Sequence, residues 1–271
     1  MDFMEDSAAK QILERNRFTF GENWTQFLAI LDDARVASAE ASLVEKFGNL
    51  DGLTFLDIGS GSGLFSLAAR NLGAEVISFD FDEESVACAR ELRQRFRPSD
   101  TGWRIEQGSV LDSDYMGTLG KFDVVYSWGV LHHTGQMWRA IELAADRVKE
   151  DGRILLALYN DQGVISTCWT HVKRRYVRAG PFGKKLIFGT VGQFLLTRAR
   201  INDVVTHRDK SPSRGMDRKR DAVDWIGGYP FEVSKPNQIV SVLNPAGFIL
   251  KQQWLVGNRL GCNEYLFQRV L

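Results

Sequence analysis

The chain has 271 residues, which is enough for one large α/β domain or at most two small ones. With 44% hydrophobic and 25% charged residues, its composition is that of an ordinary globular protein whose core is stable without disulfide bonds. The formal net charge is zero. The three cysteines are scattered and show neither metal-ligand spacing nor a disulfide framework, and no apolar run is long enough to span a bilayer. We therefore expect a soluble protein of a reducing cytoplasm, without a metal site.

The order of apolar segments along the chain predicts a parallel sheet. Residues 4–48 have helical spacing, so we expect N-terminal helices within 1–50. Short apolar runs then alternate with amphipathic segments, and such alternation is typical of a doubly wound α/β fold. The predicted strands are Thr54–Ile58, Glu75–Phe79, Trp103–Glu106, Phe122–Ser127 and Arg153–Tyr159, and the predicted helices are Gly63–Leu72, Glu83–Phe96 and Gln136–Lys149.

The alternation stops after Tyr159 and resumes near Lys235. A helix at Lys235–Leu243 precedes strands at Phe248–Val256 and Glu264–Val270, which we expect to form an antiparallel pair closing the sheet. Residues 160–232 are therefore interpreted as a helical insertion within a single domain that spans 1–271.

A glycine-rich turn follows the first predicted strand, in FLDIGSGSG. Gly59, Gly61 and Gly63 permit a tight turn with bare backbone, and the helix that starts there presents free N–H groups. Asp80 stands at the end of the next strand, where a carboxylate can accept both hydroxyls of an adenosine ribose. This pattern predicts a nucleotide-containing ligand.

The spacing of the glycines argues against a dinucleotide. A dinucleotide fingerprint has glycine at positions one, three and six, whereas Leu64 occupies position six here. Asp57 also precedes the turn, and its carboxylate would repel a pyrophosphate but attract a cationic amino-acid group. S-adenosylmethionine carries both a sulfonium and an α-ammonium, so we predict it as the cofactor.

The segments LDIGSGSG, FDFDEESVACAR, QGSVLD and FDVVYSWGVLHHTG resemble the class I methyltransferases over residues 50–160. The likeness is to the 2-polyprenyl-6-hydroxyphenol methylase group, and the C-terminal part resembles related bacterial methyltransferases. The resemblance implies a seven-stranded Rossmann-like sheet whose last strand is antiparallel. It implies that Asp57 and the turn hold the methionine part, that Asp80 holds the ribose, that Phe81 packs on the adenine, and that Trp128 closes over the methionyl chain. The implied cofactor residues are Asp57, Gly59, Ser60, Gly61, Gly63, Asp80, Phe81, Ser109, Val110 and Trp128.

Two histidines follow the fourth predicted strand, at the sheet edge where such folds bind ligands. Because a hydroxyl acceptor gains from a base, and imidazole is a serviceable base near neutral pH, we predict His133 as the catalytic base and His132 as structural. The alternative is that one or both histidines only hydrogen-bond a loop. Tyr159, Asn160 and Asp161 either position the acceptor or cap the next helix. Trp24 and residues Asp224–Glu232 are candidates for covering the pocket, with packing as the alternative for each; Cys262 is left without a role.

A basic block lies inside the insertion. Residues 171–220 hold 14 Lys or Arg against 3 Asp or Glu, an excess of +11, beside the apolar stretch Leu186–Leu196. Such a segment can pack on its own domain, or it can contact an anionic membrane that delivers a lipid-like substrate. A third alternative is a surface that binds nucleic acid, which its few aromatic residues make less favourable.

These observations predict an S-adenosylmethionine-dependent methyltransferase of a small molecule, with an oxygen as the acceptor atom. The alternatives are an RNA-modifying methyltransferase and a non-catalytic protein that binds S-adenosylmethionine as a partner.

Overall fold

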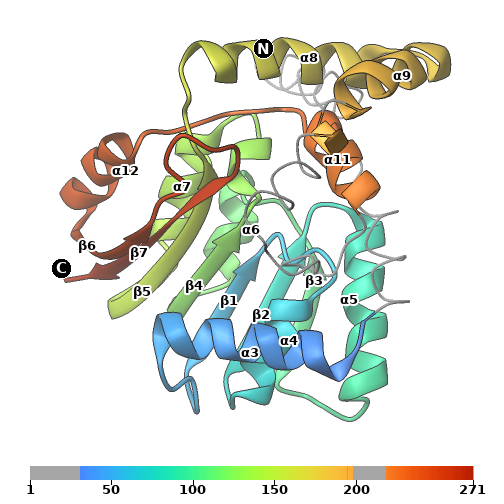
Figure 1. The fold of residues 1–271 in the computed structure, drawn as a ribbon. Helices are drawn as coiled ribbons and strands as arrows, with labels where there is room; N and C mark the ends of the chain where they lie inside the picture. The colour runs from blue at the N-terminus through green and yellow to red at the C-terminus, as the bar shows by residue number, and fades with distance from the viewer. Residues whose placement is uncertain (1–30, 194, 198–217, 271) are drawn as a thin grey trace, which may run out of the picture. The chain divides into compact units, whose positions relative to one another are not determined.

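A seven-stranded sheet organises the protein, with strand order β3-β2-β1-β4-β5-β7-β6 (Figure 1). The computed structural model describes residues 31–193, 195–197 and 218–270. The strands are β1 Thr54–Ile58, β2 Glu75–Asp80, β3 Trp103–Gln107, β4 Phe122–Trp128, β5 Val148–Tyr159, β6 Phe248–Trp254 and β7 Cys262–Arg269. Strands β1 to β5 pair in parallel, and β7 runs antiparallel between β5 and β6. The predicted doubly wound seven-stranded sheet with an antiparallel last strand is confirmed.

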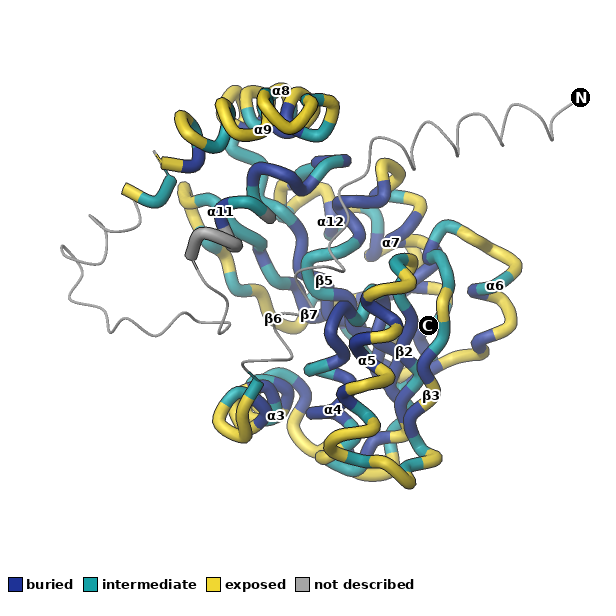
Figure 2. Tube along the Cα trace, turned by 90° about the vertical axis from the view of Figure 1, so that its right-hand side faces the viewer, coloured by how far each residue is buried: buried dark blue, intermediate teal, exposed yellow. Residues whose placement is uncertain are grey.

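Helices cover both faces of the sheet, as expected when right-handed crossovers join parallel strands. On one face, α3 Asp33–Phe47, α4 Leu64–Asn71 and α5 Glu83–Phe96 pack on side chains such as Phe55, Val124 and Leu155. On the other, α6 Ser113–Thr118, α7 Met137–Ala145 and α12 Pro236–Leu243 pack on side chains such as Leu56, Val125 and Ile154. Figure 2 shows the inner strands mostly dark blue and the outer sides of these helices yellow.

Local sequence explains where these helices begin. The side chain of Asp82 accepts the N–H of Glu84 as the N-cap of α5, and Glu83 and Glu84 complement the positive end of the helix dipole. Gly63 begins α4 with a left-handed backbone, φ 81°, which only glycine adopts without strain.

One predicted boundary was wrong. The helix expected over 136–149 ends at Ala145, and β5 already begins at Val148. The pairing with β4 jumps from Phe122↔Val148 to Val124↔Arg153, so the intervening residues bulge out, with Asp151 at φ 59°. The prediction ended the helix at Lys149 and began the strand at Arg153, because the residues of a bulge do not show the alternating apolar pattern of a strand.

Contacts between residues separate the described chain into two compact units. One comprises residues 162–232 and the other the sheet with its helices, 31–161 and 233–270. The first unit holds α8 Val164–Arg178, α9 Pro181–Ile187, the π-helix η2 Phe188–Gly192 and α11 Arg218–Gly227, so the predicted helical character of this region holds where it is described. The helices predicted N-terminal to residue 31, and Trp24 with them, lie outside the described residues.

None of the helices in the ranges described is long and apolar enough to cross a membrane.

Candidate functional site

The candidate site lies where the carboxyl ends of β2, β1, β4 and β5 come together at one edge of the sheet. The strand order reverses direction at β1, with β2 on one side and β4 on the other, and open α/β sheets bind ligands at such a switch point. The glycine turn after β1 therefore lies at the position the fold reserves for a ligand.

The turn is built from three glycines with positive φ: Gly59 at 72°, Gly61 at 54° and Gly63 at 81°. Its conformation brings the backbone close to neighbouring segments. An ideal Cβ on Gly59 would lie 2.4 Å from Cγ1 of Val130, and one on Gly63 would lie 2.9 Å from Cβ of Ala89. A larger residue at either position would be strained and would clash, so the tight turn predicted from the sequence is present.

Asp80 ties this turn to the end of β2. Its Oδ2 accepts the backbone N–H of Gly61 at 2.9 Å, and its Oδ1 accepts the N–H of Asp82 at the same distance. Because a carboxylate can accept about four hydrogen bonds, anchoring the turn is compatible with accepting ribose hydroxyls as well. The structure thus brings together two residues that lie nearly twenty positions apart.

Asp57 lies beneath the turn and is 2% exposed. Its Oδ2 accepts the hydroxyl of Ser66, from α4, at 2.5 Å. Burial, with a smaller contribution from the negative charge of Asp80, raises the pKa of Asp57 to about 7, against the opposing effect of the Ser66 hydrogen bond. A cation placed beside Asp57 would favour its charged form, so this carboxyl group is suited to a cationic ligand.

Ser60 offers a further polar group in the turn. Its hydroxyl oxygen is shielded from solvent and has no hydrogen-bond partner among the described residues. A buried hydroxyl without a partner is costly, so it marks a place for a hydrogen-bonding ligand. Together with Asp57 and Asp80, this turn fits the amino-acid and ribose parts of S-adenosylmethionine.

The remaining cofactor candidates lie at or just after the carboxyl ends of β2, β3 and β4. Phe81 is 36% exposed, and an exposed ring suits a stacking role. Val110 is buried in the core, and the hydroxyl of Ser109 accepts the N–H of Leu111. The indole N–H of Trp128 donates to Glu264 at 3.1 Å.

The two histidines form an aromatic cluster with Tyr159. They lie in the short helix η1 Leu131–His133, directly after Val130, which contacts Gly59. The ring of His132 stacks on Tyr159 at 3.8 Å between centroids, and His133 meets Tyr159 edge-on at 5.3 Å. Both histidines are buried. The cluster therefore adjoins the glycine turn, as predicted.

Asn160 organises the mouth beside this cluster. Its side chain donates to the carbonyl oxygen of Gly257 and accepts the amide of Asn263, at 2.6 and 3.0 Å. Asp161 lies 4.0 Å from Lys235 and donates its backbone N–H to Ser234. In these contacts both residues hold backbone segments at the end of β5, and neither caps the next helix, α8, whose N-cap is Gly163 without a side-chain hydrogen bond.

Two residues of this region were missed from the sequence. Ser66 and Glu264 were passed over as a helix residue and a strand residue. The available signal was a polar side chain within an apolar run, LFSLAA for Ser66 and NEYLF for Glu264, because a polar group buried in a core needs a partner.

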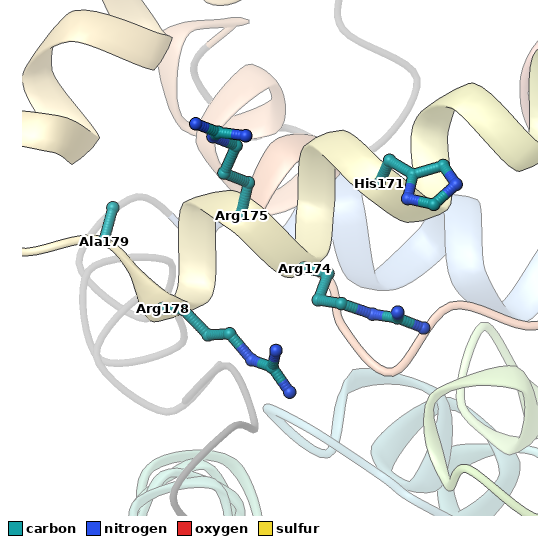
Figure 3. A pocket seen from close by; sticks show the side chains of 5 residues that line it. All are labelled: His171, Arg174, Arg175, Arg178 and Ala179. Carbon is teal, nitrogen blue, oxygen red and sulfur yellow. The ribbon is translucent and has the colours of Figure 1, made fainter.

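The insertion unit carries its own polar features. Lys173 is fully buried, with Nζ 4.3 Å from the Trp225 ring centroid and 4.7 Å from that of Phe231, so this cation of the basic block faces the interior of its unit. A hollow of about 470 Å³ lies against α8 and is lined by His171, Arg174, Arg175, Arg178 and Ala179. Figure 3 shows Arg174 and Arg178 extending to one side of α8 and Arg175 to the other.

No set of three or more His, Cys, Asp or Glu side chains that could hold a metal ion occurs in the part of the chain that the structure describes.

Comparison with known proteins shows which proteins this chain is similar to. A family model described as a methyltransferase domain matches residues 49–195, more than half of the chain. A ubiquinone biosynthesis O-methyltransferase from Paramagnetospirillum magneticum is 33% identical over 122 residues, covering 45% of each protein. A ribosomal protein L11 methyltransferase from Helicobacter hepaticus is 30% identical over 130 residues, covering 44% of this chain and 40% of that protein. The chain thus spans about half the length of the curated relatives it matches.

Solved structures share the fold. Magnesium protoporphyrin IX methyltransferase from Synechocystis PCC 6803, with bound SAH, superposes with a TM-score of 0.53 at 19% identity, covering 86% of this chain and 81% of that one. A structure of the same enzyme with bound SAM gives a TM-score of 0.52 at 18% identity, covering 86% of this chain and 77% of that one.

Proposed function

This chain belongs to the methyltransferase domain family, and we propose on that premise that it is an S-adenosylmethionine-dependent methyltransferase of a small molecule. The observation that carries the proposal is the glycine turn, bound to Asp80 on one side and resting on buried Asp57 on the other. This arrangement offers acceptors for a cationic amino acid and a ribose at the switch point of the sheet.

In this proposal each side of the turn binds a different part of the cofactor. Asp57 pairs with the α-ammonium group, and the Ser60 hydroxyl and the turn backbone hydrogen-bond the same end. Asp80 accepts the ribose hydroxyls, and Phe81 packs on the adenine with Ser109 and Val110 at its edge. When bound, S-adenosylmethionine supplies an electrophilic methyl group on a sulfonium.

The protein's task is then to align an acceptor and to remove its proton. Alignment alone can supply about 7–11 kcal/mol of a reaction barrier. We assign proton removal to His133, because its segment contacts the glycine turn through Val130 and because a positioned base contributes about 10²–10⁴-fold. His132, whose ring contacts both His133 and Tyr159, holds the base in place.

The acceptor atom we propose is a hydroxyl oxygen. A base is of most use to a hydroxyl acceptor, and the curated relatives include ubiquinone biosynthesis O-methyltransferases from several bacteria. Those relatives are named for their own substrates, and what supports the present proposal is that the methyltransferase family model, at residues 49–195, includes the glycine turn and both histidines.

We propose further that residues 160–232 are an insertion in a single methyltransferase domain. Within it, Asp224–Glu232 serve as a lid. The insertion brings a lipid-like acceptor from a membrane surface. Its helix α9 exposes 82% of Phe182 and 61% of Leu186, beside exposed Lys184 and Lys185. Residues 162–197 contain no Asp or Glu. Exposed apolar side chains among uncompensated cations are what binding at an anionic interface requires.

The test combines binding with turnover. Calorimetry should show that the purified chain binds S-adenosylmethionine and prefers it to NAD. Incubation with labelled cofactor and fractionated extract should then place the label in a small organic molecule. Preference for NAD would contradict the cofactor assignment. Label in RNA would identify the RNA-modifying alternative, and binding without any label transfer would identify a non-catalytic partner protein.

A further inference from the structure

Four residues form a row across one face of the sheet. The strand register places Trp128 of β4 opposite Ala157 of β5, Ala157 opposite Glu264 of β7, and Glu264 opposite Trp254 of β6. The methyl group of Ala157 is the smallest side chain in the row, and it lets the Trp128 indole reach over β5. The indole N–H donates to Oε1 of Glu264 at 3.1 Å, although the two residues are 136 positions apart.

The carboxylate of Glu264 is itself held from the other side. Nζ of Lys46, in the last turn of α3, lies 2.7 Å from Oε2 of Glu264 and 4.0 Å from the centroid of the Trp254 ring. The side chains of Lys46 and Glu264 are 10% and 20% exposed, so their attraction is only weakly screened by water. Each oxygen of the Glu264 carboxylate thus has its own partner, Oε1 the Trp128 indole and Oε2 the Lys46 ammonium. The carboxylate that accepts the indole N–H is therefore held in one orientation.

Trp128 and Asp57 lie on the same face of the sheet. Asp57 pairs with Tyr126, and Trp128 follows Tyr126 by two residues, so all three side chains project to one side. The indole is therefore next to the strand end that carries Asp57, on the side that the proposed function gives to the methionine part of the cofactor.

We propose that Glu264 is the positioning residue that fixes the Trp128 indole at the methionyl end of the cofactor, with Lys46 as its counter-ion. This inference rests on the proposed function. Glu264 touches neither cofactor nor acceptor in this scheme and acts through Trp128 alone.

A double-mutant cycle on cofactor affinity tests the inference. Calorimetry with S-adenosylmethionine would compare the wild type, Trp128→Phe, Glu264→Ala and the double variant. Loss of a hydrogen bond to a charged group typically weakens affinity about tenfold or more, so each single variant should bind about tenfold more weakly. Because Glu264 acts only through Trp128, the double variant should bind no more weakly than Trp128→Phe alone.

Matched variants separate positioning from stability. Glu264→Gln keeps an oxygen that can accept the indole N–H and should retain affinity within threefold. Lys46→Met removes the ion pair but leaves that hydrogen bond, so it should lower Tm and weaken affinity less than Glu264→Ala does. If Glu264→Ala does not fold, Glu264→Asp, which withdraws the carboxylate by one methylene, carries the same expectation.

The outcomes distinguish the two proposals. Failure of the wild type to bind S-adenosylmethionine would overturn the proposed function and this inference with it. Wild-type binding, together with unchanged affinity in folded Glu264→Ala, would overturn this inference alone. An additive loss in the double variant would overturn it too, because Glu264 would then act without Trp128.

Discussion

The Ser66 hydroxyl donates to the Asp57 carboxyl group at 2.5 Å, in a position that water does not reach. Burial raises the pKa of Asp57 to about 7, and a cationic ligand favours the charged form of this group. Affinity for S-adenosylmethionine should therefore fall as pH drops below about 7, approaching tenfold per pH unit. Calorimetry between pH 5.5 and about 8.5 measures this slope, and Asp57→Asn should flatten it. A wild-type affinity that does not change over this range would contradict the assignment.

The same carboxyl group predicts the pH dependence of stability without ligand. Its folded pKa lies above the unfolded value of 3.8, so the folded state holds the proton more tightly. The contribution of Asp57 to stability is present below about pH 4 and is lost as pH rises through about 7. Thermal unfolding of the wild type against Asp57→Asn should show the difference in Tm growing in favour of the variant over this interval. A constant difference would show that Asp57 is already charged at low pH.

Asp80→Ala should weaken S-adenosylmethionine binding about 10- to 150-fold, because charge-assisted hydrogen bonds contribute about 1.5–3 kcal/mol. The variant also frees the N–H of Gly61, which loosens the turn. Calorimetry measures the affinity, and the unfolding temperature serves as the control for the turn. If folded Asp80→Ala bound S-adenosylmethionine with wild-type affinity, the assignment of Asp80 to the ribose would be wrong.

His133→Ala should lower turnover about 10²–10⁴-fold with cofactor affinity near that of the wild type. His132→Phe keeps an aromatic ring against Tyr159 and is the matched control, because it should preserve the stack at a far smaller cost in rate. Single-turnover kinetics with the identified acceptor measures both. A loss below threefold for His133→Ala would reduce that histidine to a structural residue.

Exposed Phe182 and Leu186 provide the test of membrane contact. The double change to Ser should weaken binding to liposomes that contain anionic lipid at all salt concentrations, since the lost contribution is apolar burial. Changing Arg174, Arg175 and Arg178 to Gln should weaken it only at low salt, by about 1 kcal/mol for each residue that reaches the surface. Wild-type protein that does not sediment with such liposomes at low salt would contradict the proposal.

Lys173 illustrates why charge alone is a poor guide to a surface. It belongs to the run Lys173–Arg175, yet it packs between Trp225 and Phe231, residues more than fifty positions away. Replacing Lys173 would remove a buried contact of the insertion. Its neutralisation should destabilise the protein and is unsuitable for the liposome experiment.

The arrangement of the candidate cofactor residues was predictable because its signals are local. Gly59 to Gly63 and Asp57 lie within seven residues, and the strand–turn–helix context predicts that Asp80, at the next strand end, lies beside the turn. The partners that hold these groups were not predictable in this way. Glu264 reaches Trp128 only through the register of two further strands, and Lys46 joins them from a helix that precedes the sheet.

Tyr159 and Ser234 are separated by more than seventy residues, yet the Ser234 N–H donates to the Tyr159 carbonyl oxygen at 3.0 Å. Asn160 and Ser234 also form an isolated parallel β-bridge. The polypeptide thus leaves the sheet and rejoins it at adjacent backbone positions. A short turn in place of 162–232 would preserve the sheet, and the corresponding segment of a relative can be spliced between the same two points. On the proposal that the insertion delivers the acceptor, chimaeras made at this junction would take their cofactor site from one parent and their choice of acceptor from the other.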